Sequence, residues 1–262
     1  MATSRTARNQ DQIEAKFQAA LTRRTLRKPA PTYIQGNRSE PVRVYNEDEL
    51  QRMGLQFFAE VEAHLRFYTD KLGHDVMWFN DWLKKYWAAW SGGIDEAAVH
   101  ELLSPEVSYK DPLSFGRQMV GIQAFIDYNQ AFFDAAPDLR YDAIPGQASI
   151  SVSPSGELLF MARYSGCGHW DNPLRMYPFT PGSPAIPGNG KFTQLYPVDR
   201  YHFNAEGKMT HGETLWDPID ALQLLRVVPS DTSRTFKAVA RVGGAASTLV
   251  RLKNRLPFIG EK

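Results

Sequence analysis

The order of its hydrophobic periods is the feature of this sequence that most limits its fold. From residue 46 to residue 135, apolar residues recur mainly every three or four positions, which is the period of helices that bury one side. From residue 148 to residue 216 they alternate in short runs between turn residues, which is the period of strands. Helices followed by a mostly antiparallel sheet predict an α+β fold, with the helices packed on one face of a curved sheet.

End signals divide these patterns into elements. Asn46 has an N-cap side chain, acidic residues follow it and Gly73 ends the pattern, so a helix is predicted over 46–72. Residues 166–191 are rich in Gly and Pro and predict a long excursion. The other predicted helices cover 79–90, 95–103, 121–135 and 217–225, and the predicted strands cover 107–110, 148–152, 157–164, 191–204 and 208–216.

Charge separates the two ends of the chain from its middle. Residues 1–31 carry a net charge of +5 and residues 226–262 carry +6, which leaves −10 for residues 32–225. The total of +1 argues against a dedicated nucleic-acid binder. Two surfaces would attract the basic ends: the acidic body of a second copy, as in a homodimer, or an anionic membrane in a peripheral contact.

We therefore divide the chain into four parts: a basic, Pro-containing arm over 1–45, an additional amphipathic helix over 46–75, a central domain over 76–228 and a basic amphipathic tail over 229–262. Residues 12–27 of the arm have the period of a helix, but we expect no ordered core there. Ile13, Phe17, Ala20 and Leu21 lie on one side of that helix.

The location and the metal chemistry of the chain are also limited by composition. The single cysteine, Cys167, excludes an internal disulfide framework and a Cys-based zinc site. The N-terminal residues lack the apolar core of a secretory signal, and no stretch approaches the roughly 18 apolar residues of a membrane span. We expect a cytoplasmic protein without a metal site, because His202 and His211 flank one turn but lack a third ligand.

Four stretches of the central domain carry a resemblance to a known superfamily. They are Lys84-Lys85-Tyr86-Trp87-Ala88-Ala89-Trp90, Val107-Ser108-Tyr109-Lys110-Asp111-Pro112, Ala136-Pro137-Asp138-Leu139, and the stretch from Val198-Asp199-Arg200 to Gly207-Lys208-Met209. In this order and spacing they resemble the nuclear transport factor 2-like superfamily, which includes the ketosteroid isomerases and the SnoaL-like polyketide cyclases. The resemblance implies a cone-shaped barrel, a strongly curved sheet around helices with a deep hydrophobic pocket, and it makes a dimer an expectation.

The resemblance to ketosteroid isomerases also implies three catalytic residues. Asp111, before Pro112, matches the base that removes a proton next to a carbonyl, and Tyr86 and Asp199 match the donors that stabilise the enolate. Such chemistry requires no cofactor, and the implied substrate is a hydrophobic steroid- or polyketide-like molecule. Strand alternation turns Tyr201 and Phe203 inward with Asp199. The predicted substrate-binding residues are Phe160, Tyr164, Tyr201, Phe203, Trp216, Trp90 and His169.

Two other functions stay open at this point. A protein of the same fold can bind a lipid or another partner without catalysis, in which case Asp111 is a strand-end turn residue and Tyr86 is a core aromatic. A polyketide cyclase or dehydratase would use His169, or another residue of a lid formed by the 166–191 excursion, as a general acid. The cyclase pattern is incomplete here, because Thr214 and Gly212 stand where its aspartate and histidine would be.

Overall fold

The computed structural model describes residues 2–22, 26–31, 45–177, 182–230 and 232–242. Residues 243–262 of the predicted tail lie outside these ranges. The helices are α1 (Ala2–Thr22), α2 (Glu47–Leu72), α3 (Trp78–Ala89), α4 (Glu96–Leu102), α5 (Ile122–Ala135) and α6 (Pro218–Leu224), with a 3-10 turn η1 (Pro112–Ser114). The strands are β1 (Leu103–Lys110), β2 (Met119–Val120), β3 (Arg140–Val152), β4 (Leu158–Trp170), β5 (Leu174–Arg175), β6 (Ala185–Ile186), β7 (Lys191–Leu195), β8 (Val198–Phe203) and β9 (Met209–Leu215).

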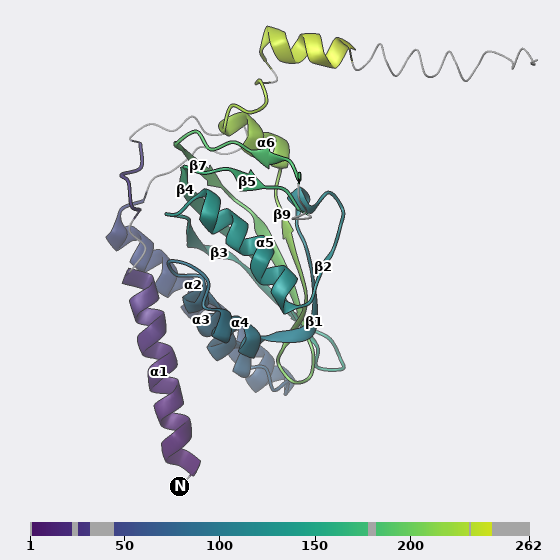
Figure 1. Ribbon diagram of the computed structural model, residues 1–262. Coiled ribbons are helices and arrows are strands. Elements are labelled where there is room, and N and C mark those ends of the chain that lie inside the picture. Colours follow the sequence, from purple (N-terminus) through teal and green to yellow (C-terminus); the bar gives the residue numbers. More distant parts are fainter. Residues whose placement is uncertain (1, 23–25, 32–44, 178–181, 231, 243–262) are drawn as a thin grey trace, which may run out of the picture.

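The main sheet follows the strand order β2-β1-β9-β8-β4-β3, and β7 pairs with the far part of β4. β1 and β9 run parallel, and the other pairs are antiparallel. Figure 1 shows the sheet curving behind α5. In the described chain the strand path ends at β2 on one side and at β3 on the other. The α+β fold is therefore confirmed, whereas the predicted barrel is an open, curved sheet.

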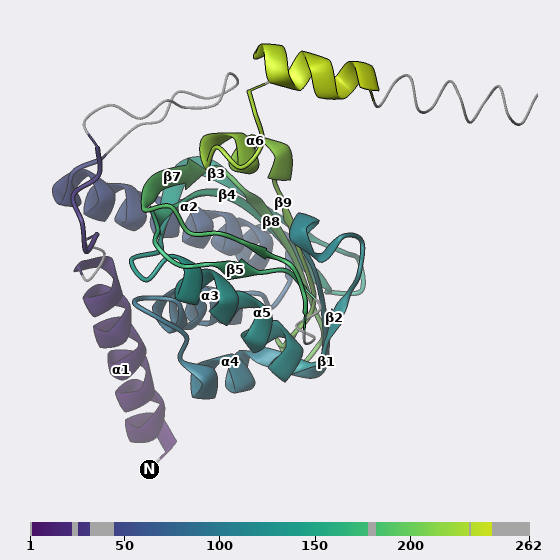
Figure 2. The same ribbon diagram turned by 45° about the horizontal axis from the view of Figure 1, so that its top comes forward.

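Helices α3 and α5 fill the concave face of the sheet (Figure 2). The ring of Phe79 on α3 lies 5.0 Å from that of Phe160 on β4, and the ring of Phe125 on α5 lies 4.9 Å from that of Tyr109 on β1, measured between centroids. These aromatic pairs belong to one continuous core. Phe160 and Tyr109 also line the cavities between these helices and the sheet.

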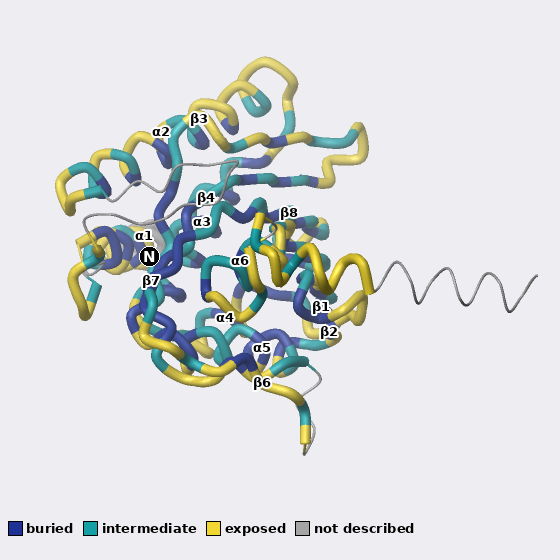
Figure 3. The backbone as a smooth tube through the Cα atoms, turned by 90° about the horizontal axis from the view of Figure 1, so that it is seen from above, coloured by how far each residue is buried: buried dark blue, intermediate teal, exposed yellow. Residues whose placement is uncertain are grey.

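Helix α2 forms where its end signals predict. The Asn46 side chain accepts a hydrogen bond from Glu49 N at 2.8 Å, and the Glu49 carboxylate accepts one from Asn46 N at 3.0 Å. Gly73 ends the helix with a φ of 73°, which glycine adopts without strain. The helix lies along β3, where Tyr68 OH donates to Ile150 O at 3.1 Å. Its outer side is exposed (Figure 3).

Helix α1 corrects the expectation that the N-terminal arm has no ordered core. The ring of Phe17 packs edge-on against Phe58 of α2 with centroids 4.5 Å apart, and Glu14 pairs with Lys84 of α3 at 2.7 Å. The buried residues of α1 are those that the period places on one side: Ile13, Phe17, Ala20 and Leu21. The arm thus extends the core across the backs of α2 and α3.

The excursion predicted over 166–191 begins later than its glycines and prolines suggest, because the chain leaves the main sheet only after Trp170 and returns to it at Lys191. β4 continues to Trp170, β5 and β6 form a short hairpin, and β7 returns to pair with β4. A Cβ atom at Gly168 would lie 3.1 Å from Leu139 Cα, so this glycine permits close packing within a strand. The strand predicted over 191–204 is divided into β7 and β8, because Pro197 between them has no N–H to donate.

The contact between α1 and α2 can be tested at Gly54. A Cβ atom there would lie 2.8 Å from Leu21 Cδ2, although alanine is otherwise favoured over glycine inside a helix by about 1 kcal/mol. We expect Gly54→Ala to give no such gain in the native chain and to recover roughly 1 kcal/mol in a Leu21→Ala background. Urea unfolding of the four chains measures the coupling. Additive effects would contradict the packing of α1 on α2.

Candidate active site

Two adjoining apolar cavities open between the concave face of the sheet and the helices. The first has an empty volume of about 890 Å³ and the second about 690 Å³, open mouths included. Tyr109, Asn129, Tyr141 and Tyr164 line both cavities. A ligand in either cavity would therefore contact side chains that also face the other one.

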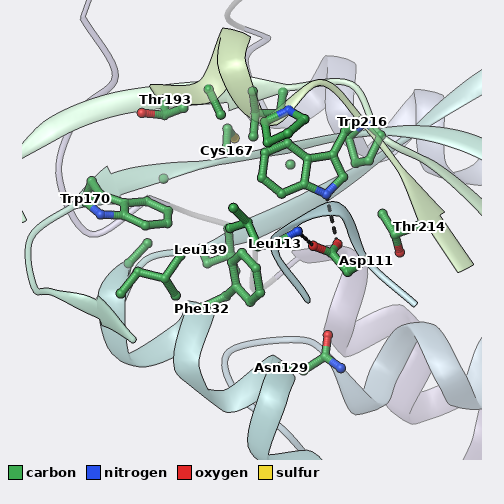
Figure 4. A pocket seen from close by; sticks show the side chains of 18 of the residues that line it. Asp111, Leu113, Asn129, Phe132, Leu139, Cys167, Trp170, Thr193, Thr214 and Trp216 are labelled. Carbon is green, nitrogen blue, oxygen red and sulfur yellow. Dashed lines mark hydrogen bonds between the residues drawn. The ribbon is translucent and has the colours of Figure 1, made fainter. Parts of the chain in front are cut away.

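Asp111 lines the first cavity at the end of β1 (Figure 4). The strand ends there because Pro112 begins η1, and the Asp111 carboxylate caps this turn by accepting from Leu113 N at 2.9 Å. Tyr128 OH of α5 donates to Oδ1 at 2.6 Å, and Trp216 Nε1 donates to Oδ2 at 2.8 Å. Burial raises the pKa of Asp111, although the three hydrogen bonds oppose the shift. Asp111 is thus a fixed, desolvated carboxyl group.

Asp199 lines the second cavity from the middle of β8. The alternation of this strand buries Asp199 and Tyr201, as predicted. Thr214 Oγ1 donates to Oδ1 at 2.6 Å, Tyr164 OH donates to the same oxygen at 3.1 Å, and Tyr201 OH donates to Oδ2. Burial raises the pKa of Asp199 to about 6 against the effect of these donors, and the charge of Asp111 adds a smaller upward shift.

Two more hydroxyl groups extend the network around Asp199. Tyr86 OH on α3 lies 3.2 Å from Tyr201 OH, and Tyr109 OH forms a hydrogen bond with Thr214 Oγ1. Because Tyr201 and Thr214 donate to Asp199, their oxygens are left to accept from Tyr86 and Tyr109. Burial first, and then the charge of Asp199, raises the pKa of both tyrosines. Both side chains therefore stay protonated at neutral pH.

The three predicted catalytic residues fall into two groups. Tyr86 and Asp199 are joined through Tyr201, whereas Asp111 lines the neighbouring cavity and takes its hydrogen bonds from other side chains. Tyr109 lines both cavities, and the charges of both carboxyl groups act on it. Burial is the largest cause that raises the pKa of Tyr109, and the charges of Asp199 and Asp111 are the next largest. The two carboxyl groups are therefore close enough to interact electrostatically.

Five of the seven predicted substrate-binding side chains line a cavity. Trp216 lines the first, Tyr164 lines both, and Phe160, Tyr201 and Trp90 line the second. Phe203 is a correction. It is the next inward residue on β8 after Tyr201, but its ring packs 4.7 Å from that of Trp82 and 5.2 Å from that of Phe79. The aromatic side of α3 fills the space in front of Phe203, so this residue belongs to the core.

His169 is a second correction. It lies on β4 instead of on a lid, because that strand continues to Trp170. Its backbone N donates to Asp138 Oδ1 at 2.7 Å, its Nδ1 lies 2.8 Å from Asp138 Oδ2, and its ring packs against Phe192 of β7. The side chain is held between Asp138 and β7 and does not line either cavity. A general acid for a cyclase would have to come from another residue.

Three residues that complete the site were not among the predicted site residues. Tyr109 precedes Asp111 by two positions and Thr214 precedes Trp216 by two, so strand alternation alone places each pair on one face. Tyr128 has no comparable signal, because the helical period only places it on the inner side of α5. Its hydrogen bond to Asp111 depends on how far α5 lies from the end of β1.

The histidines on the outer face of the sheet do not complete a metal site. His202 and His211 lie opposite each other on β8 and β9 with ring centroids 5.7 Å apart, and His211 Nδ1 lies 2.7 Å from Ser108 Oγ. Within the described ranges, no three His, Cys, Asp or Glu side chains are grouped as metal ligands.

Burial of Asp199 should make stability depend on pH. The folded pKa of about 6 is above the ordinary value of 3.8, so the stability contributed by its proton is complete below about pH 4 and lost as the pH rises through 6. Relative to an Asp199→Asn variant, we expect the native chain to lose roughly 3 kcal/mol of unfolding free energy across that range. Urea unfolding at several pH values measures this difference. Parallel stability curves would contradict the raised pKa.

No family model and no curated protein matches this chain. Similar solved structures include a candidate SnoaL-like polyketide cyclase from Jannaschia sp. CCS1, with 15% identity over 66% of this chain and 96% of that chain and a TM-score of 0.39. A candidate polyketide cyclase from Bacillus cereus ATCC 10987 has 16% identity over 78% of this chain and 98% of that chain, with a TM-score of 0.39. A steroid delta-isomerase from Pseudomonas aeruginosa has 15% identity over 57% of this chain and 81% of that chain, with a TM-score of 0.32. Two of these neighbours are thus named as polyketide cyclases and one as a steroid isomerase.

Proposed function

We propose that this chain is an enzyme that removes a proton next to the carbonyl group of a hydrophobic, steroid- or polyketide-like substrate and stabilises the resulting enolate. The observation that supports this most directly is the pair of buried carboxyl groups, Asp111 and Asp199, in two apolar cavities with a common wall. Burial raises the pKa of both. Two such groups in neighbouring sites are suited to different roles in one proton transfer.

Asp111 is the base in this proposal. Its carboxylate offers about four lone-pair positions, and the donors Leu113 N, Tyr128 OH and Trp216 Nε1 occupy three of them. The fourth is available for a proton from carbon, and desolvation makes the carboxylate a stronger base than it would be in water. The broken C–H bond leaves its electron pair in a C=C–O⁻ enolate. Return of the proton to another carbon completes an isomerisation, with no change of oxidation state.

Asp199 controls the direction of the hydroxyl network. When it is ionised, Tyr201 donates to it and Tyr86 donates to Tyr201. When Asp199 is protonated it can donate to Tyr201, so that Tyr201 donates to Tyr86 and the Tyr86 proton is free to turn into the second cavity. With a pKa of about 6, the protonated form exists near neutral pH. In a substrate that extends from the first cavity into the second, the Tyr86 hydroxyl would then donate to the enolate oxygen in a dry site.

One observation favours a second candidate, a non-catalytic ligand-binding protein. Each oxygen of both carboxyl groups already accepts a hydrogen bond from the protein itself. Such satisfied groups also suit a cavity that only binds. A cyclase or dehydratase begins with the same proton abstraction as an isomerase, so it differs in the product and not in the first step.

Proton exchange separates catalysis from binding. The chain is incubated in D₂O with a steroid β,γ-unsaturated ketone and with an aromatic 1,3-diketone, and loss of the proton signal next to the carbonyl is followed by NMR. Tryptophan fluorescence reports binding in the same samples. We expect exchange well above the buffer rate for a ketone that binds. Binding without exchange would contradict the enzyme and support the ligand-binding candidate, while the product identifies isomerisation, cyclisation or dehydration.

A further inference from the structure

Beyond α6, the chain forms a helix over 234–242 that stands away from the sheet (Figures 1 and 2). Ser233 caps it, because the Ser233 hydroxyl accepts from Phe236 N at 3.0 Å. Val239 and Val242 are 64% and 70% exposed. Figure 3 shows the exposed trace of this segment next to α6. Val239 and Val242 are thus left without cover by the described part of the chain, whereas Phe236 is half-buried.

The helix has two chemically different sides. At about 3.6 residues per turn, its three basic residues fall on one side and its larger apolar residues fall on the opposite side. No acidic residue occurs between 234 and 242. The basic residues are Arg234, Lys237 and Arg241, and the larger apolar residues are Phe236, Val239 and Val242.

The basic residues of the N-terminal arm and those of the helix over 234–242 differ in their ion pairs. In the N-terminal arm, Lys28 pairs with Asp171 at 2.7 Å, Arg27 with the same carboxylate at 3.2 Å, and Lys16 with Asp95 at 3.8 Å. These residues are thus engaged by the acidic body of their own chain. For the three basic residues of the helix over 234–242, the described ranges hold no ion pair.

The helix follows in the sequence shortly after residues that line the first cavity. Leu222 and Leu225, at the end of α6, line that cavity. Only residues 226–233 connect them to the helix, a link that spans at most about 27 Å. Val227 in this link and Ile219 on α6 are 41% and 50% exposed. Exposed apolar residues thus occur on α6 and in the link as well as on the helix.

We propose that the helix over 234–242 binds an anionic lipid bilayer, lying in the plane of its surface and keeping the end of α6, which lines the first cavity, within about 27 Å of the membrane. Such helices place one apolar side at the boundary of the acyl chains, while their lysines and arginines interact with anionic headgroups. The acidic body of a second copy would satisfy only the basic side and leave Val239 and Val242 in water. None of the helices in the described chain is long and apolar enough to cross a membrane. The proposal does not depend on the proposed proton transfer.

Sedimentation with vesicles tests this contact in the full-length chain. We expect binding to vesicles that contain phosphatidylserine and phosphatidylcholine, little binding to phosphatidylcholine alone, and a loss of binding at high salt. Arg234→Gln, Lys237→Gln and Arg241→Gln together should weaken binding roughly 100-fold, since each basic residue near such a surface contributes about 1 kcal/mol. The matched control removes three exposed charges from α2, by Arg52→Gln, Arg66→Gln and Lys71→Gln, and should bind as the native chain does.

Two further measurements separate insertion into the membrane from adsorption by charge and from self-association. A variant with Val239→Gln and Val242→Gln should weaken vesicle binding at least 10-fold without changing the charge, because the apolar side inserts into the membrane. Unchanged binding of this variant would mean that charge alone adsorbs the chain, and it would overturn the proposal. Analytical ultracentrifugation without lipid tests the second copy. A dimer that the triple substitution dissociates would assign the helix to self-association and would also overturn the proposal.

Discussion

Replacing Asp111 by Asn is expected to lower turnover roughly 100- to 10,000-fold while ligand binding persists. A positioned general base contributes about this factor, and the amide of asparagine cannot accept a proton from carbon. The side chain keeps its size, so the walls of the first cavity are preserved. Exchange of the proton next to the carbonyl in D₂O measures the rate, and quenching of tryptophan fluorescence measures binding.

The hydrogen bonds of Asp111 suggest the control for folding. In Asp111→Asn, the amide oxygen can still accept from Tyr128 and Leu113, but the amide NH₂ then faces the N–H of Trp216. Two opposed donors destabilise a buried site, so the single variant should be less stable than the native chain. Adding Trp216→Phe removes one donor. The double variant should regain stability without regaining turnover.

A second buried carboxylate provides the control for catalysis. Asp138 is 9% exposed, accepts from His169 and does not line either cavity. Asp138→Asn should therefore destabilise the chain without changing the rate of the folded fraction. Equal turnover of Asp111→Asn and the native chain would remove Asp111 from the mechanism. Equal losses in Asp111→Asn and Asp138→Asn would indicate that both act only through folding.

Most of the fold follows from local signals in the sequence, and the exceptions have physical reasons. The caps at Asn46 and Gly73 mark the ends of α2 because their chemistry is local. The extension of β4 could not be predicted in this way, because Gly168 serves contact with Leu139, a residue far away in the sequence. Burial of α1 likewise depends on the surface that α2 and α3 present together. A periodic segment does not reveal whether such a surface exists.

The residues of the candidate site likewise separate into those that local signals predict and those that only the assembled fold explains. Alternation on β8 predicts which side chains share a face with Asp199, because successive side chains of a strand point to opposite faces of the sheet. Alternation does not tell whether an inward residue faces a cavity or packed side chains. Phe203 is therefore predicted to line the cavity, whereas it lies in the core. The donors to Asp111 come from α5 and from the end of β9. Only the assembled fold brings these elements together, and the sequence holds no spacing that links them.

The two networks also suggest why both carboxyl groups are buried but differently bonded. Asp111 accepts from two N–H groups of fixed direction, on the Leu113 backbone and the Trp216 indole, and from one hydroxyl group, on Tyr128, so its carboxylate is fixed. Asp199 accepts only from hydroxyl groups, and these can rotate. A fixed group suits the removal of a proton from one position. A group held by rotatable hydroxyls suits a change in the direction of donation as its charge changes.

Tyr86→Phe is the second substitution for which we expect a large effect. Loss of its hydroxyl should lower turnover roughly 100- to 1,000-fold, as expected for one donor to an oxyanion in a dry site. The fold should change little, because the ring of Tyr86 stacks on that of Trp82 with centroids 4.7 Å apart and phenylalanine keeps that contact. The proton-exchange rate, measured together with the affinity for the ketone, checks this expectation.

Tyr68→Phe is the matched control for Tyr86→Phe. Its hydroxyl also makes a part-buried hydrogen bond, to Ile150 O, but it does not line either cavity. It should leave the exchange rate unchanged.

The pH profile adds a test of Asp199. If its protonated form turns the Tyr86 proton toward the enolate, turnover of the native chain should fall as the pH rises above about 6, and the residual rate of Tyr86→Phe should lose that dependence. A Tyr86→Phe variant with native turnover would show that the enolate oxygen is stabilised elsewhere, with Tyr109 on the common wall as the next candidate.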